Sequence, residues 1–310
     1  MKKLFYPFLL LTALSVFTVS CEKDTGEPVN QPSTGGGGTP VDPPAPPTPP
    51  STTPDPDPSV HLVMGNPSSA TTDVANFANY LMVKPQYTLS YHRDRGIPNW
   101  VSWHLDEGWL GSANRQDDFR ADASLPAGWY RVTESDYDYA TNGFDRGHNT
   151  PSGDRTNSVA NNSATFLMTN MIPQAPNNNQ KTWVGLEDYC RKLVSQGNEL
   201  YIIMGSYGSG GTGNQGLKTT IAGGKVTVPA SIWKVVVVLP KGENDLSRVT
   251  TTTRVIAINT PNNNNVTTAW DTYRTTVDAI ETATGLNLLS NLPESVQTTL
   301  EAKKDTGPTN

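Results

Sequence analysis

Three short segments of this chain carry side chains suited to one chemistry, the metal-assisted cleavage of a phosphodiester. The segments are Phe144-Asp145-Arg146-Gly147-His148, Thr169 to Gln174, and Asn179 to Glu187. A histidine can activate water, asparagine and glutamate offer oxygen ligands to a hard cation, and arginine can neutralise phosphate charge. We therefore interpret residues 144–187 as the candidate site, which the rest of the chain must position.

The elements around this site form a mixture of strands and helices. Apolar and β-branched runs predict strands at 87–91, 101–105, 200–204, 225–229, 233–239 and 254–259. Helical periodicity predicts helices over 182–196, 271–284 and 72–82, and clusters of glycine and asparagine predict surface loops over 206–216 and 262–265. The pattern predicts one α+β domain over 59–295, with a mostly antiparallel sheet and helices on both sides. Residues 296–310 are expected to form a C-terminal tail that frays from Asp305 onward.

The N-terminus has the features of an export signal. A charged start, Met1-Lys2-Lys3, precedes a mostly apolar run from Leu4 to Val16 and a small residue before Cys21. The run is too short for a transmembrane helix, so residues 1–20 are interpreted as a signal peptide. Its end resembles a bacterial lipobox, which predicts lipidation of Cys21, although Thr18 stands where leucine is usual. The alternative is an ordinary secretory signal that ends beside a chance cysteine.

A lipidated Cys21 predicts an exported lipoprotein that is anchored in the outer membrane by its lipid. The domain would then face either the periplasm or the cell surface. Residues 21–58 are then its tether, with Gly35 to Gly38 and, from residue 22, twelve prolines. Such a composition cannot bury a core and favours polyproline II, which holds a domain away from the membrane. The alternative interpretation of this segment is a ligand for a proline-recognition domain.

Composition argues against other classes of protein. The net charge is −6, but six acids and one lysine lie between Cys21 and Pro58, so the domain itself is only mildly acidic. This argues against a sequence-reading DNA-binding protein with a broad basic face, and permits an enzyme with one local basic cleft. Cys190 has no disulfide partner if Cys21 carries lipid, and the four histidines show no zinc-binding spacing.

The order and spacing of the chemical segments resemble one family. The chain is similar to the DNA/RNA non-specific endonucleases, the ββα-metal or His-Me finger nucleases that include endonuclease G-like enzymes. The blocks that carry the similarity are Tyr87–Tyr91, Pro98–Leu105, Arg115–Asp122, Asp145–His148, Thr169–Glu187, Val228–Val235 and Val277–Gly285. The resemblance implies a ββα-metal motif, in which a strand pair ends at Arg146 and His148 and a helix carries Asn179 and Glu187.

The resemblance also implies roles for individual residues. His148 is the candidate general base, because a near-neutral pKa lets imidazole accept a proton from water. Asn179 is the candidate direct ligand of one Mg²⁺, with Mn²⁺ as a substitute, and Glu187 holds a metal-bound water. Asn179 is preferred to Asn177 and Asn178 because Glu187 then follows eight residues later, as in the family.

Arginines and a second asparagine complete the predicted site. Arg146 and Arg115 are expected to contact phosphate and stabilise the transition state, because guanidinium offers paired donors. Arg120 lies five residues beyond Arg115 and is the alternative to it, and a surface salt bridge is the structural alternative for Arg115. Asn170 is grouped with the catalytic residues, because it matches a family asparagine that supports or positions the metal centre.

Contacts confined to phosphate imply that both DNA and RNA are substrates, with weak sequence preference. The expected products carry 5′-phosphate and 3′-hydroxyl ends. Asp145 is expected to support the motif, while Trp183 and His104 have structural roles in the core. Export protects the host genome from such an enzyme, and a separate protein inhibitor is a further partner that the sequence does not show.

Two other functions are compatible with parts of the sequence. A surface nucleic-acid-binding protein could keep the fold and lose turnover, although the intact His148, Asn179 and Arg146 argue against this. An adhesin or glycan-binding module on a lipidated stalk fits the tether but leaves the motif unexplained. Magnesium-dependent plasmid nicking separates all three.

Overall fold

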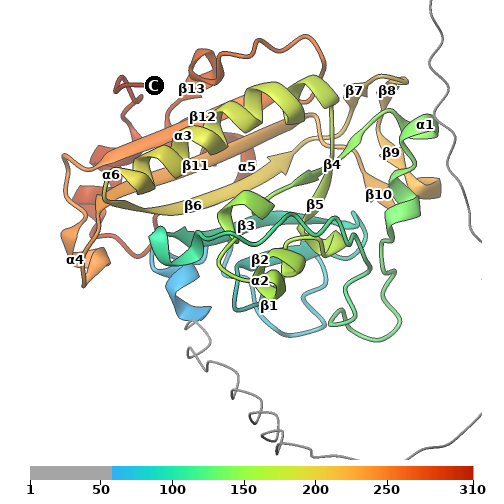
Figure 1. Cartoon of the computed structure of the whole chain (residues 1–310), viewed down its shortest axis with the longest axis horizontal. Helices are drawn as coiled ribbons and strands as arrows, with labels where there is room; N and C mark the ends of the chain where they lie inside the picture. Colours follow the sequence, from blue (N-terminus) through green and yellow to red (C-terminus); the bar gives the residue numbers. More distant parts are fainter. Residues whose placement is uncertain (1–57, 310) are drawn as a thin grey trace, which may run out of the picture. The chain divides into compact units, whose positions relative to one another are not determined.

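A seven-stranded antiparallel sheet forms the centre of the domain in residues 58–309, the part of the chain that the structure, a computed structural model, describes (Figure 1). The strands, in their order across the sheet, are β1 Tyr80–Val83, β2 Thr88–His92, β3 Ile97–Leu105, β6 Asn198–Tyr207, β11 Ser231–Pro240, β12 Arg254–Pro261 and β13 Arg274–Thr275. All neighbouring pairs are antiparallel, which confirms the predicted sheet. The predicted signal peptide, Cys21 and the tether as far as residue 57 lie outside the described residues.

Helices cover both faces of this sheet. The three that do so are α3 Val184–Ser195, α5 Val277–Thr284 and α6 Glu294–Glu301. On β11, Trp233 and Val235 belong to the apolar layer of α5 and α6, whereas Ile232 and Val236 belong to the layer of α3. One strand serves both layers because successive side chains point to opposite faces. Figure 1 shows α3 lying across its face of the sheet, and the predicted helices on both sides are confirmed.

Shorter elements surround the sheet. They are the helices α1 Tyr139–Asn142, α2 Val159–Ala164 and α4 Asp245–Arg248, and the strand pairs β4 Asp145–His148 with β5 Met171–Gln174, β7 Gly211–Gly213 with β8 Gly216–Lys218, and β9 Thr220–Ile221 with β10 Val226–Thr227. The predicted strand over 225–229 is thus reduced to the short β10. Within residues 58–309, no helix is long and apolar enough to cross a membrane.

Two predicted helices differ from the structure. The segment 72–82 forms turns that lead into β1, because polar groups bind their own backbone: the Asp73 carboxylate accepts a hydrogen bond of 2.9 Å from the amide two residues on. Such local bonds compete with a helix. The helix predicted over 271–284 begins only at Val277, where the Thr276 hydroxyl caps it, since the residues before it pair with β12 as β13.

The predicted C-terminal tail over 296–310 is instead part of the fold. α6 extends into it, and Leu300 is 1% exposed. Asp305, predicted to fray, forms ion pairs of 2.9 Å with Arg254 and with Arg274. These arginines lie on β12 and β13, so the edge of the sheet holds the segment in place.

The asparagine-rich segment 262–265, predicted as a surface loop, begins with a buried residue. Asn262 is 1% exposed, and its side chain accepts a hydrogen bond of 2.8 Å from the Ala175 amide. It also donates to the carbonyls of Pro173 and Pro229, at 2.9 and 2.8 Å. The side chain therefore satisfies backbone groups at the end of β5, next to the candidate site.

Candidate active site

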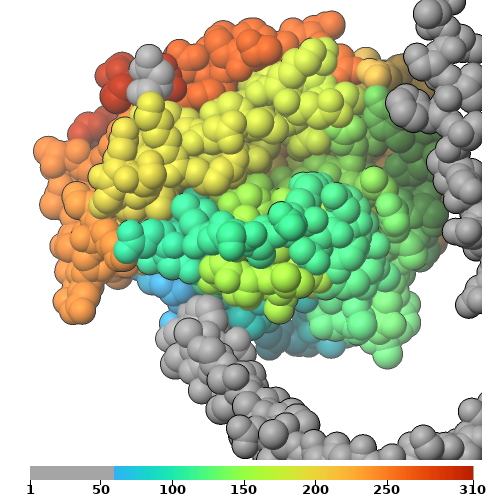
Figure 2. Space-filling model, viewed as in Figure 1, coloured from blue at the N-terminus to red at the C-terminus, as the bar shows by residue number. Residues whose placement is uncertain are grey.

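A cleft beside the β4–β5 pair gathers nearly all of the predicted site residues. Its inner part is a cavity of about 400 Å³, whose lining includes Arg115, Arg146, His148, Asn179, Glu187 and Arg191. A second cavity of about 630 Å³ shares Arg115, Arg146 and Asn179 with it. Three distant parts of the sequence meet here: the segment after β3, the β4–β5 pair, and α3 with the turn before it. Figure 2 shows the first and last of these side by side, coloured teal and yellow.

The β4–β5 pair sets the directions of Arg146 and His148. His148 lies opposite Met171 on β5. The two site residues are two positions apart on one strand, so their side chains project from the same face. Between them, Gly147 allows the strands to pack closely, because a Cβ at this position would overlap the side chain of Gln174 on β5. The glycine of the Asp-Arg-Gly-His segment is therefore a packing requirement behind two functional side chains.

His148 lies at the wall of the cleft as a neutral imidazole. The residue is 8% exposed, and its ring packs against Phe119 and Phe166, with ring centroids 5.6 and 4.9 Å away. Burial, followed by the charges of Arg115 and Arg146, lowers the pKa of His148 from 6.5 to about 3. Its Nε2 atom is buried and has no hydrogen-bond partner among the described residues. An uncharged imidazole with an unpaired nitrogen beside a cleft has the form that a general base requires.

Asn179 lies in a π-helical turn, Asn178–Trp183, that leads into α3. Its side-chain nitrogen donates to a carboxylate oxygen of Asp145 at 2.9 Å, and Gln180 donates to the same oxygen at 2.9 Å. Because Asp145 binds the nitrogen end of the amide, the carbonyl oxygen is left to act as a ligand. Single π-helical turns are frequent at functional sites, where they displace a side chain from the regular helical position.

Glu187 supplies the second oxygen donor of the cleft. Its side chain is 13% exposed and lines the inner cavity. Burial raises the pKa of this carboxyl, and the ammonium group of Lys234, 3.6 Å away, opposes that effect. An amide oxygen and a carboxylate beside several arginines fit a hard divalent cation that keeps part of its water shell. Asn179 and Glu187 are therefore the residues that would hold a metal ion here.

Arg115 and Arg146 line both parts of the cleft, and each is paired with an exposed carboxylate. The Arg115 Nε atom lies 2.6 Å from Asp117, and the Arg146 Nη1 atom lies 2.6 Å from Glu134. Arg146 also lies over the ring of Phe119, 4.2 Å from its centroid. Exposed ion pairs of this kind are weak, so a phosphate group can replace either carboxylate.

The structure separates Arg115 from its alternative, Arg120. Arg115 donates a hydrogen bond of 3.0 Å to Ser152, which also lines the cleft. Arg120 instead donates to Asp118 at 2.7 Å and to the Ser163 carbonyl at 2.9 Å. In the described part of the chain Arg120 lines neither cavity of the cleft, so of the two arginines Arg115 is the one placed to meet a phosphate.

Comparison with known proteins agrees with this arrangement. Residues 65–295 match the model of the DNA/RNA non-specific endonuclease family. The chain belongs to this family. A nuclease from a Nostoc species is 53% identical over 247 residues, which cover 80% of this chain and 86% of that protein. The mitochondrial nuclease EXOG of Danio rerio is 35% identical over 156 residues, which cover 48% of this chain and 45% of that protein.

The fold agrees as well. A solved complex of EndoG with EndoGI has a TM-score of 0.61 at 23% identity, and the match covers 79% of this chain and 96% of that chain. This DNA/RNA non-specific endonuclease is therefore an α+β nuclease that acts on nucleic acid, from a family that depends on a divalent metal.

One predicted catalytic residue of the endonuclease does not line the cleft. Asn170 is fully buried, and its side chain accepts a hydrogen bond of 3.0 Å from the Thr150 amide. It also donates to the carbonyls of Thr150 and Thr165, both at 2.9 Å. Because the whole amide is engaged with backbone groups, the structure places Asn170 beside the backbone that follows His148. This placement fits the supporting or positioning role expected for it rather than contact with the substrate.

Arg191 was missed in the interpretation of the sequence, although it lines the inner cavity of the endonuclease. Its guanidinium donates to the buried carboxylate of Asp154 at 2.9 Å. A Cβ on Gly153 would lie 2.8 Å from the Arg191 Nη1 atom, so this loop passes close beside the guanidinium. The available signal was spacing, because Arg191 follows Glu187 by four residues and shares its helix face.

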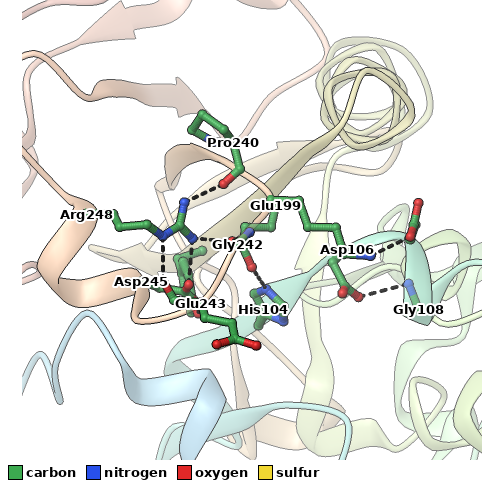
Figure 3. Close-up of polar contacts among 12 residues, drawn as sticks. His104, Asp106, Gly108, Glu199, Pro240, Gly242, Glu243, Asp245 and Arg248 are labelled. Atoms are coloured by element: carbon green, nitrogen blue, oxygen red, sulfur yellow. Dashed lines mark hydrogen bonds and ion pairs between the residues drawn. The ribbon is translucent and has the colours of Figure 1, made fainter.

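A second polar cluster of the endonuclease surrounds His104 (Figure 3). His104 Nε2 lies 3.0 Å from Glu199, and one nitrogen of Arg248 lies within 2.6 Å of both Glu199 and Asp245. The spacing of His104, Glu199 and Asp245 suits a metal ion, but the guanidinium of Arg248 already supplies a cation between the two carboxylates. His104 therefore has the structural role predicted for it, and Trp183, 1% exposed, is a core residue as predicted.

Proposed function

We propose that this chain is an exported endonuclease that hydrolyses phosphodiester bonds of both DNA and RNA. In this proposal His148 is the general base, and one Mg²⁺ is held directly by Asn179 and through water by Glu187. The observation that carries it is the meeting of a neutral imidazole, two oxygen donors and three arginines in one cleft. Mn²⁺ is expected to substitute for Mg²⁺, because both accept oxygen ligands.

The chain's own residues would divide the chemistry as follows. His148 takes a proton from the attacking water, and its lowered pKa keeps it unprotonated before the substrate binds. Arg115 and Arg146 exchange their carboxylate partners for phosphate oxygens and so neutralise the charge that repels the nucleophile. A divalent cation, when bound, stabilises charge on the phosphate and on the leaving oxygen. A phosphate beside the two arginines also offsets their effect on His148, which raises the pKa of the base toward the working pH.

The lining of the cleft supports weak discrimination between nucleic acids. The lining residues that the two cavities share, Arg115, Arg146 and Asn179, offer cations for phosphate and a ligand for a metal ion. Phosphate contacts carry no sequence information, and DNA and RNA share them. We expect products with 5′-phosphate and 3′-hydroxyl ends, which a DNA ligase reseals without prior treatment by a kinase.

The test is cleavage of supercoiled plasmid and of structured RNA by the purified protein with Mg²⁺, Mn²⁺ or EDTA. His148→Ala is compared with His92→Ala, a matched control because His92 lies at the end of β2 and does not line the cleft. Loss of a general base is expected to slow cleavage at least about 100-fold, with little effect in the control. Binding without cleavage by the unmodified protein favours the binding module, and the absence of both binding and cleavage leaves only the fold supported.

We also propose that the chain is anchored to the outer membrane through lipid on Cys21. The support comes from the sequence alone: a charged start, an apolar run and a small residue before Cys21. Mass spectrometry of the mature N-terminus and membrane fractionation test the anchor, with Cys21→Ser beside the unmodified protein. A Cys21→Ser variant that stays in the membrane contradicts it. Protease treatment of intact cells then separates a surface location from a periplasmic one.

A further inference from the structure

Lys234 is a cation in the apolar layer between the sheet and α3. It lies on β11 and is 1% exposed. Its neighbours on the same face, Ile232 and Val236, are both buried in the core that α3 covers. The side-chain alternation of the strand therefore calls for an apolar residue at position 234. An ammonium group at such a position costs free energy unless it is paired, so its presence needs a partner that accounts for it.

The surroundings of Lys234 direct it toward a single carboxylate. Its Nζ atom lies 5.0 Å from the ring centroid of Trp183 and 5.4 Å from that of Trp103. The indole N–H of Trp183 donates to the sulfur of Met204, and that of Trp103 donates to the carboxylate of Asp154. These bonds hold both rings in place beside the ammonium group. Aromatic faces attract a cation but do not neutralise it.

Glu187 is the neutralising partner. Its carboxylate lies 3.6 Å from Lys234 Nζ, and within residues 58–309 it is the one carboxylate in ion-pair distance of that atom. The same side chain lines the inner cavity of the cleft. Glu187 thus joins two environments, because it meets a buried cation on its core side and the proposed metal site on its cleft side.

We propose that Lys234 is a positioning residue for phosphodiester cleavage, which holds the Glu187 carboxylate from the core side so that it faces the cleft. The inference rests on the proposed function, since Glu187 must act in the cleft for its position to affect the rate. A purely structural lysine would change only the free energy of unfolding. A positioning lysine changes turnover and the metal requirement through Glu187 alone.

The first test replaces the cation and keeps its length, as Lys234→Met in the full protein. We expect the number of metal ions bound per protein to stay the same. We expect kcat to fall about 10- to 100-fold, which is the usual loss when a residue that supports a metal ligand is removed. The Mg²⁺ concentration for half-maximal activity is expected to rise. KM for DNA is expected to change less than about threefold, because phosphate contacts are intact. Lys192→Met is the matched control, since Lys192 is an exposed lysine on α3 outside the cleft.

The decisive test is a double-mutant cycle with Glu187→Gln. If Lys234 acts through Glu187, the double variant Lys234→Met/Glu187→Gln cleaves plasmid within about twofold of Glu187→Gln alone. Fully additive losses overturn the proposal, as does a Lys234→Met variant with normal kcat and normal metal requirement. The double variant removes both charges of the pair, so it remains informative if Lys234→Met alone fails to fold.

Failure of the proposed function gives a different result from failure of this inference. Absence of metal-dependent cleavage by the unmodified protein, or full activity of Glu187→Gln, contradicts the role of Glu187 in the cleft. A normal loss of activity in Glu187→Gln, together with full activity in Lys234→Met, contradicts only the role of Lys234.

Discussion

The carboxylate of Asp145 accepts a hydrogen bond of 2.9 Å from the side-chain nitrogen of Asn179, which joins β4 to the π-helical turn that leads into α3. We predict that Asp145→Ala leaves the Asn179 amide free to rotate and raises the Mg²⁺ concentration for half-maximal activity about 10-fold or more. A metal titration of plasmid nicking measures this. Gln180→Ala is the control, because Gln180 binds the same carboxylate but lacks the proposed ligand role. An unchanged metal requirement in Asp145→Ala would mean that another group orients Asn179.

Arg115 and Arg120 provide a pair of variants with equal change in charge. Only Arg115 lines the cleft of the described domain. A lost charge-assisted hydrogen bond costs about 1.5–3 kcal/mol, so Arg115→Ala is expected to lower kcat/KM roughly 10- to 100-fold. Arg120→Ala is expected to change it less than about threefold. Equal losses, measured on the same plasmid substrate, would show that overall charge rather than position matters.

We expect Glu134, the ion-pair partner of Arg146, to compete with the substrate for this arginine. The pair is exposed, and such pairs contribute about 0–1 kcal/mol. We predict that Glu134→Gln lowers KM by up to about fivefold at low salt, and that the difference disappears at high salt because counterions screen the original pair. Glu107→Gln is the control, since Glu107 pairs with Lys241 outside the cleft. An unchanged KM at low salt would contradict the competition.

The buried imidazole of His148 is expected to make folding sensitive to acid. Its pKa is about 3 in the folded chain, below the ordinary 6.5, so between these values the unfolded chain binds a proton that the folded chain does not. Stability present above pH 6.5 is therefore lost as the pH falls toward 3. His148→Gln removes this loss. Between pH 7.5 and pH 5, we predict that the free energy of unfolding of the unmodified protein falls by about 2 kcal/mol more than that of His148→Gln. Urea unfolding of both proteins at the two pH values measures this difference. If the free energy of unfolding falls equally in both proteins, the prediction is wrong.

Glu281 is expected to make folding sensitive to base. It lies with Asp278 and Glu301 in a group of carboxyls, and burial raises its pKa to about 7, with the neighbouring charges adding to the effect. Its contribution to stability is present below its ordinary pKa near 4.5 and is lost as the pH rises through 7. We predict that Glu281→Gln raises Tm at pH 8 and has little effect at pH 4.5. Thermal unfolding measures Tm, with Glu294→Gln as the control because Glu294 is an exposed glutamate of α6. An equal rise of Tm in both variants would show that the loss of one negative charge, and not the raised pKa of Glu281, is the cause.

Local sequence was sufficient for much of the fold. The apolar and β-branched runs in β3, β6, β11 and β12 predict these strands, which are buried on both faces of the sheet. Helical periodicity over 182–196 predicts most of α3. That this helix meets a strand pair at the Asp-Arg-Gly-His segment is implied by the resemblance to the endonuclease family and not by local spacing.

Other features depend on segments that are distant in sequence. The choice of Arg115 over Arg120, the engagement of Asn170 with backbone groups, and the burial of Asn262 follow from the contacts of the folded chain. The pairing of Lys234 with Glu187 joins β11 to α3 across a buried layer. Residue type and spacing do not encode these pairings, because burial and partner choice are set by how separate elements pack, and that packing brings a buried lysine to the carboxylate of Glu187.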